Sequence, residues 1–148
     1  MSIALISDTH GLLRPEVVDR LAGADRILHM GDVGDPAILT QLQEIAPLTA
    51  IRGNVDYGDW ATRLPATIEV DVHGQRAYLI HNLAQLDLDP AVAGIDLVLY
   101  GHTHRPDERE DAGVLFVNPG SIGPRRFDLP VSMAWLDPGP SIRFETVA

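Results

Sequence analysis

Short apolar runs separated by polar loops dominate the first third of the chain. Three mostly apolar runs fit buried strands: residues 3–6, 26–30 and 48–52. The segments between them carry helix start signals, since Pro15 precedes an amphipathic stretch to residue 21 and Asp35-Pro36 opens another to residue 45. Strand, loop, helix and strand in this order predict parallel βαβ units, whose loops gather at one edge of a sheet.

The pattern changes after residue 67. Segments 68–72 and 75–80 flank His73-Gly74 and predict a hairpin, and Asp89-Pro90 predicts a short helix. Four further strands are expected at residues 95–100, 114–118, 131–136 and 142–147. No helix separates the last two, which favours antiparallel pairing. We expect a mixed α/β fold, formed as one domain over residues 1–148 because no linker interrupts the pattern.

Composition narrows the function classes. The 148 residues carry 11 cations and 21 anions, and 11 − 21 gives a net charge of −10, which disfavours nucleic acid polymers and anionic lipids as partners. The sequence has no cysteine, so disulfide scaffolds, thiolate nucleophiles and iron–sulfur clusters are excluded. Every basic residue is Arg, which excludes Schiff-base chemistry and the P-loop lysine.

The sequence shows neither a targeting nor a membrane signal. No run approaches the roughly 20 apolar residues that a membrane span needs, and the first residues lack the pattern of a signal peptide. We therefore expect a cytoplasmic protein without a membrane partner. Homo-oligomerisation is left open.

Short polar motifs follow the apolar runs at their ends: Asp8-Thr9-His10, Gly31-Asp32, Gly53-Asn54-Val55-Asp56, His81 and Gly101-His102-Thr103-His104. Imidazole, carboxylate and amide oxygen are ligands for divalent ions, and seven such donors in one place could hold two ions. Residues two apart on a strand point to the same side, so each D-x-H or H-x-H pair faces one cavity if the extended geometry continues. A glycine, which lets the backbone turn sharply, precedes Asp32, Asn54 and His102.

The order D-x-H, G-D, G-N, H and G-H-x-H resembles the calcineurin-like metallophosphoesterase superfamily, in particular its small single-domain bacterial and archaeal phosphodiesterase branch. The resemblance covers nearly the whole chain. It implies a four-layer α/β sandwich in which two mixed β-sheets are flanked by helices. It also implies two ligand sets that share one bridging carboxylate: Asp8, His10, Asp32 and His104 for one metal, and Asp32, Asn54, His81 and His102 for the other.

The resemblance also implies a reaction. A metal-dependent phosphoesterase would hydrolyse phosphodiester, or phosphomonoester, bonds of a small substrate by in-line attack of a hydroxide bridging two ions about 3.5–4 Å apart. Mn²⁺ is the expected ion, with Zn²⁺, Fe²⁺ or Ni²⁺ as alternatives, because cellular supply decides rather than the order of affinities. Two dications add roughly four positive charges, so an anionic phosphate is accepted locally by an acidic protein.

Two positions depart from the family pattern. Larger phosphatases of the superfamily have a His after the ligand Asn, thought to protonate the leaving group, whereas Val55 stands here. Asp56 or a metal-bound water is the candidate replacement for that proton donor. Asn82 follows His81 where the family commonly has Gly, so we expect a less accurate placement of His81 and a weaker second metal.

Arginines are the candidates for contacting a substrate phosphate, because a guanidinium matches its oxygens in pairs. Arg105 is favoured because it is adjacent to His104. The candidate catalytic residues are therefore Asp32, Asn54, Asp56 and Arg105.

Each motif also has a structural explanation when taken alone. Asp and Asn form turns and caps at strand ends, His81 suits a buried strand, His29 suits the core and His73 suits a solvated turn. The competing hypothesis for the whole protein is a non-catalytic scaffold of the same fold, like the retromer subunit, which binds partners through apolar patches. That relative has lost part of the ligand set, whereas this chain keeps every position, which favours an enzyme.

Overall fold

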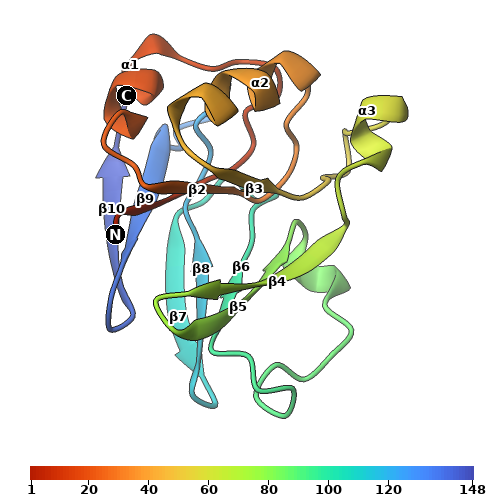
Figure 1. The fold of residues 1–148 in the computed structure, drawn as a ribbon, viewed down its shortest axis with the longest axis vertical. Helices are drawn as coiled ribbons and strands as arrows, with labels where there is room; N and C mark the ends of the chain where they lie inside the picture. Colours follow the sequence, from red (N-terminus) through yellow and green to blue (C-terminus); the bar gives the residue numbers. More distant parts are fainter.

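Ten strands and three α-helices make up the computed structural model, which describes all 148 residues. In chain order they are β1 (Ile3–Ile6), α1 (Pro15–Leu21), β2 (Arg26–His29), α2 (Pro36–Ile45), β3 (Leu48–Ala50), α3 (Asp59–Thr62), β4 (Thr67–Val72), β5 (Gln75–Ile80), the 3₁₀ turn η1 (Leu83–Gln85), β6 (Leu97–Leu99), β7 (Asp107–Asp111), β8 (Val114–Asn118), β9 (Ser132–Asp137) and β10 (Ser141–Thr146). The strands form sheet A, in the order β10-β9-β1-β2-β3, and sheet B, in the order β4-β5-β6-β8-β7. The two sheets face each other (Figure 1).

Sheet A contains the predicted βαβ units. Strand β1 pairs in parallel with β2, and β2 in parallel with β3, while α1 and α2 form the crossovers on the outer face (Figure 1). The Asp35 carboxylate accepts the Ala37 N–H at 2.9 Å and so begins α2 as predicted. Strands β9 and β10 pair antiparallel, also as predicted, and β9 adds antiparallel to β1.

Sheet B combines the predicted β4–β5 hairpin with the parallel neighbours β5, β6 and β8. Apolar side chains from both sheets fill the space between them, among them Leu5, Leu28 and Leu79. The outer face of sheet B is covered by the segment around η1, where Leu83 and Leu86 pack against the strands. The two-sheet mixed α/β fold is thereby confirmed, with this thin segment as the fourth layer.

One local prediction differs from the structure, and two elements were not predicted. Asp89-Pro90 opens hydrogen-bonded turns instead of a helix, and the chain leaves them at Gly94, whose φ is +77°. Strand β7 and the short helix α3 have no counterpart in the apolar pattern. The five residues of β7 are all charged and exposed, so the strand shows no alternation, although it pairs antiparallel with β8 at the edge of sheet B.

The sheets place five strand ends at one side of the molecule. The loops after β1, β2 and β3 leave sheet A, and those after β5 and β6 leave sheet B, each at the carboxyl end of a parallel strand. The polar motifs identified in the sequence follow these five ends. None of the helices is both long enough and apolar enough to cross a membrane.

Candidate metal centre

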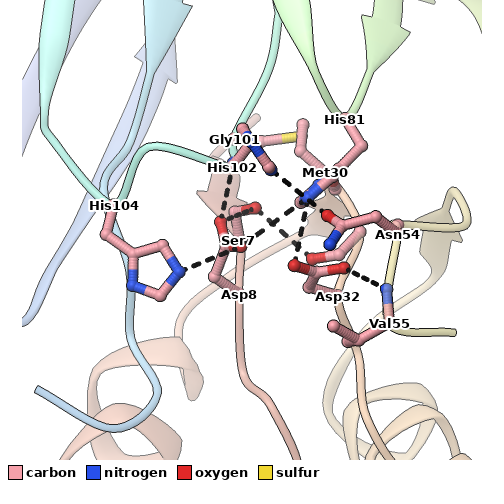
Figure 2. A network of polar contacts seen from close by, with 12 residues as sticks. Ser7, Asp8, Met30, Asp32, Asn54, Val55, His81, Gly101, His102 and His104 are labelled. Atoms are coloured by element: carbon pink, nitrogen blue, oxygen red, sulfur yellow. Dashed lines mark hydrogen bonds and ion pairs between the residues drawn. The ribbon is translucent and has the colours of Figure 1, made fainter. Parts of the chain in front are cut away.

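The seven predicted donors come together where the two sheets meet. Two groups of potential ligand atoms, each within 4.8 Å of one another, are formed by Asp8, His10 and His104 and by Asp32, His81 and His102. Each group draws on both sheets, since the aspartates follow strands of sheet A while His81, His102 and His104 follow strands of sheet B. In Figure 2, His104 approaches Asp8 from one side, and His81 and Asn54 lie on the other side near Asp32.

The two carboxylate oxygens of Asp8 have different surroundings. Its Oδ2 accepts hydrogen bonds from the Ser7 hydroxyl at 2.6 Å and from the His102 N–H at 3.2 Å. Its buried Oδ1 has no hydrogen-bond partner and lies 3.5 Å from His10 Nε2 and 3.4 Å from His104 Nε2. The hydrogen bonds fix the direction in which the free oxygen points.

Asp32 is arranged in the same way. Its Oδ1 accepts the Val55 N–H at 3.0 Å, and its Oδ2 lies 3.1 Å from His81 Nε2 and 3.4 Å from His10 Nε2. Because His10 and His81 belong to different groups, Asp32 stands between the two. This is the position that a bridging carboxylate would occupy.

His81 presents the tautomer that a metal ligand needs. Its Nδ1 lies 2.7 Å from the Met30 carbonyl, which can only accept, so in the neutral ring Nδ1 carries the proton and Nε2 keeps a free lone pair. That Nε2 is buried without a hydrogen-bond partner. The neighbouring Asn82 side chain turns away to accept the Ala84 N–H at 3.0 Å, so the departure from Gly leaves the Met30 contact of His81 intact.

Asn54 adds an amide oxygen to the second group. Its Oδ1 lies 3.2 Å from His102 Nδ1, and both side chains are exposed, unlike the buried Asp32 and His81. This side of the centre is therefore the one open to solvent and to a substrate.

The charges in the centre stabilise one another. Burial by itself would raise the pKa of Asp8, but the histidines around it, His10 first, hold that pKa well below its usual range. The pKa of Asp32 is also lowered, because His81 and the Val55 N–H outweigh burial. Burial would lower the pKa of His81, yet the facing Asp32 and Asp8 raise it. Both carboxylates are thus ionised and available as ligands.

The backbone at the donors is left-handed instead of extended. Positive φ occurs at eight non-glycine residues, and five of these are donors: Asp8 (60°), His10 (46°), Asp32 (58°), His102 (73°) and His104 (63°). The expected strand alternation therefore does not continue past β1 and β6, and His102 and His104 join different groups. Such conformations cost of order 1–3 kcal/mol each and persist where the surroundings enforce them.

Close packing explains two of the three glycines. Among the glycines that precede Asp32, Asn54 and His102, only Gly31 has a positive φ, at 99°. A Cβ on Gly53 would lie 2.2 Å from Asp32 Oδ1, and one on Gly101 would lie 2.2 Å from Ser7 Oγ. These two glycines make room for the carboxylates rather than for a turn.

The Asp56 carboxylate joins two loops of the centre. Its side chain is buried and accepts backbone N–H groups from Val33, Gly34 and Gly53 at 3.1, 2.9 and 2.9 Å. Both oxygens are engaged in joining the loop after Asp32 to the loop before Asn54. These contacts are those of a residue that holds two loops in place, and the predicted role of Asp56 as a proton donor stays a prediction.

The other residues singled out in the sequence lie outside the two donor groups. Arg105 is exposed beside His104, and its side chain makes no hydrogen bond within the protein. His29 is fully buried, and His73 is half-buried with Nε2 3.1 Å from the Leu136 carbonyl, which corrects the expectation of a solvated side chain. Ser7 was not anticipated, because a serine at a strand end carries no distinctive sequence signal.

The segment after β8 supports the centre from behind. The Asn118 amide donates to the Gly101 carbonyl and to the Thr103 hydroxyl, both at 3.0 Å. The Ser121 hydroxyl donates to the Asp8 carbonyl at 3.0 Å. The segment thus ties the loops of sheet A and sheet B to one another.

The donors fit divalent cations. Asp8 Oδ1, His10 Nε2 and His81 Nε2 are buried polar atoms without hydrogen-bond partners, and such atoms are costly unless a ligand satisfies them. Carboxylate, imidazole and amide donors suit borderline to hard dications.

Comparison with known proteins agrees with this geometry. Residues 1–139 match the calcineurin-like phosphoesterase superfamily domain. The chain belongs to this superfamily. A probable metallophosphoesterase of Methanothermobacter thermautotrophicus is 35% identical, with 93% of this chain and 87% of that protein covered. The phosphodiesterase YfcE of Escherichia coli is 30% identical, with 93% and 88% covered.

Solved structures of other proteins share the fold of this chain. The structure of the E. coli phosphoesterase YfcE aligns with a TM-score of 0.75 at 25% identity and covers 100% of both chains. Vps29 of Chaetomium thermophilum aligns with a TM-score of 0.79 at 21% identity, covering 99% of this chain and 97% of that chain. At this identity the likeness to Vps29 concerns the fold alone.

Proposed function

We propose that this protein is a metal-dependent phosphoesterase that hydrolyses the phosphodiester bonds of small substrates. Membership of the superfamily and the 30% identity to a phosphodiesterase support hydrolysis of a phosphate ester. The observation that carries the proposal is the pair of donor groups joined by Asp32, with unpartnered atoms of Asp8, His10 and His81 directed into them.

The proposed ligands divide into two sets that share Asp32. One cation would be held by Asp8, His10, Asp32 and His104, and the other by Asp32, Asn54, His81 and His102. When bound, two divalent cations, with Mn²⁺ as the proposed ion, supply Lewis acidity toward phosphoryl oxygens and make hydroxide available at neutral pH.

The protein's own residues orient the ester. Asn54 and His102 form the exposed side of the centre, so the phosphate is proposed to enter there, with the exposed guanidinium of Arg105 as a contact for its oxygens. Val55 follows the ligand Asn, and Asp56 is committed to three backbone N–H groups. Neither Val55 nor Asp56 is therefore a proton donor for the leaving group in this proposal, and esters of acidic alcohols should react fastest.

Hydrolysis of bis(p-nitrophenyl) phosphate with added Mn²⁺ tests the proposal. We expect turnover that a chelator removes and that Asp32→Ala abolishes, whereas Glu44→Gln, an exposed position of α2, retains it. Absence of turnover in the metal-loaded protein, on diesters and monoesters alike, would instead support the scaffold hypothesis.

A further inference from the structure

A cavity of about 390 Å³ opens beside the second donor group. Asn54 and His81 belong to its lining, so it is continuous with the proposed metal site. Its other walls come from the loop before β4, from β5 and from the segment around η1. The volume lies at the lower end of the roughly 300–1,000 Å³ of small-molecule pockets, enough for one organic group and too little for a polymer.

The walls of the cavity offer hydrogen bonds at several points. Thr67 and Gln85 belong to the lining and carry a hydroxyl and an amide, and the lining also includes Tyr78, a buried residue with a phenol group. Only three of the 11 lining residues are hydrophobic. An apolar ester group would leave these donors and acceptors unsatisfied, whereas a group with several donors and acceptors of its own would pair with them.

The charges around the cavity favour an uncharged group. Its only cation is Arg52, whose Nη1 already donates to the Leu64 carbonyl at 3.1 Å. Asp87 adds an exposed carboxylate at the rim, in a chain with a net charge of −10. With His81 neutral, the charges of Arg52 and Asp87 cancel, so the lining offers no net attraction for a second anionic group and an uncharged group fits it.

Asn82 shapes this cavity. Its side-chain carbonyl accepts the Ala84 N–H, and its backbone carbonyl accepts the Gln85 N–H at 3.0 Å, which together form the η1 turn. The turn places Gln85, four residues after His81, in the lining of the cavity. The residue that departs from the usual Gly is therefore the one that builds the wall beside a proposed metal ligand.

We propose that this cavity binds one ester group of a phosphodiester, and that this group is uncharged and carries several hydrogen-bond donors and acceptors. A nucleoside and a polyol such as glycerol both have this chemistry. The inference rests on the proposed function, because it places the scissile phosphate between Asn54 and His81 and directs one substituent toward Gln85 and Tyr78.

Three diesters with a common p-nitrophenyl leaving group test the inference in the Mn²⁺-loaded protein. The second ester group is thymidine 5′-, glyceryl or phenyl. We expect kcat/KM for the thymidine or the glyceryl diester to exceed that for the phenyl diester at least tenfold. The diester with the higher kcat/KM shows whether the cavity prefers a nucleoside or a polyol. Gln85→Ala should reduce this ratio by about 3–10-fold, the effect of one lost hydrogen bond. Gln41→Ala, an equally exposed glutamine on α2, should leave the ratio unchanged.

A binding measurement separates this inference from the proposed function. Calorimetric titration of the loaded protein with thymidine 5′-phosphate, glycerol phosphate and phenyl phosphate should show the same order of affinities and the same loss in Gln85→Ala. Turnover of all three diesters at equal kcat/KM, with a ratio that Gln85→Ala does not change, refutes the cavity assignment and leaves the phosphoesterase proposal standing. No turnover, together with selective binding that Gln85→Ala weakens, refutes the phosphoesterase proposal and keeps the cavity assignment.

Discussion

The donor residues hold a backbone conformation that their side chains disfavour. Five of them have positive φ, which for an L-residue other than glycine costs of order 1 kcal/mol or more. The backbone of the centre is therefore strained in the metal-free protein. A glycine in place of a donor should relieve this strain, whereas an alanine at the same position should keep it.

Substitution of His102 tests this directly. His102 is exposed at φ 73°, so little packing is lost when its side chain is removed. We expect metal-free His102→Gly to exceed His102→Ala in unfolding free energy by about 1 kcal/mol, measured by urea denaturation, because only glycine relieves the left-handed backbone. Both variants should bind Mn²⁺ more weakly than the parent. Equal stability of the two variants would contradict stored strain at this position.

His29 gives the metal-free protein a defined pH dependence. Burial lowers the pKa of His29 from 6.5 to about 4. The geometry agrees, since Nδ1 accepts the Gly31 N–H at 3.1 Å and Nε2 faces the Thr9 hydroxyl at 3.1 Å, which itself donates to the Val33 carbonyl. The neutral ring satisfies both contacts, whereas a second proton would break the one with Gly31.

The sign follows from which state binds the proton. As pH falls below 6.5 the unfolded chain protonates His29 first, so stability is complete above pH 6.5 and is lost down to about pH 4. Between pH 7 and pH 5 the loss from His29 amounts to about 2 kcal/mol. Urea denaturation in EDTA measures the unfolding free energy at pH 7 and at pH 5. The decrease between the two should be smaller in His29→Gln than in the parent protein by about 2 kcal/mol. Identical decreases would mean that His29 titrates normally in the fold.

At the scale of elements, polar side chains hold the loops in register together with backbone hydrogen bonds such as that from the His10 N–H to the Asp32 carbonyl at 2.9 Å. Asp56 joins the loops that carry Asp32 and Asn54, and Asn118 joins the strand end of β8 to the loop that carries His102. The two contacts explain how irregular segments place donors reproducibly. They also assign Asp56 a task that its neighbourhood in the sequence did not indicate.

The substitution Asp56→Asn distinguishes positioning from proton donation. An amide cannot accept all three N–H groups, so at least one is left unpaired and the unfolding free energy should fall by about 2 kcal/mol. Calorimetry should also show weaker Mn²⁺ binding, because the Asn54 loop is released. Asp59→Asn, an exposed carboxylate in α3, serves as the matched control and should change neither quantity. Lost activity at unaltered stability and metal affinity would restore Asp56 as a proton donor.

At the scale of the whole molecule, the centre connects the two sheets. Asp8, His10, Asp32 and Asn54 follow strands of sheet A, whereas His81, His102 and His104 follow strands of sheet B. Each donor group contains residues from both sheets. Bound cations would therefore act as cross-links between the sheets in addition to any role in chemistry.

Metal loading should accordingly stabilise the entire fold. Mn²⁺ at 100 times its dissociation constant adds about 2.7 kcal/mol per site, which scanning calorimetry detects as a raised Tm that EDTA reverses. His10→Ala, from sheet A, and His81→Ala, from sheet B, should each remove part of the increase, whereas Glu44→Gln should keep all of it. An unchanged Tm on addition of Mn²⁺, Zn²⁺, Fe²⁺ or Ni²⁺ would argue against a metal centre.

Much of this architecture follows from the chain itself. Apolar runs identified the buried strands and the hairpin, and Pro15 and Asp35-Pro36 marked the starts of α1 and α2, because burial and capping are local properties of these segments. The motifs named seven donors, since parallel strands gather their following loops at one edge. The all-charged β7 escaped detection because only its partner β8 makes it a strand.

Tertiary structure alone decided how the donors are used. Which oxygen of Asp8 and Asp32 is free, which nitrogen of His81 carries a proton, and that Asp56 faces three backbone N–H groups all depend on residues distant in the sequence. The same holds for the cavity beside His81, whose walls come from separate segments. Residue type determines which chemistry a side chain offers, whereas packing determines which atoms remain available for it.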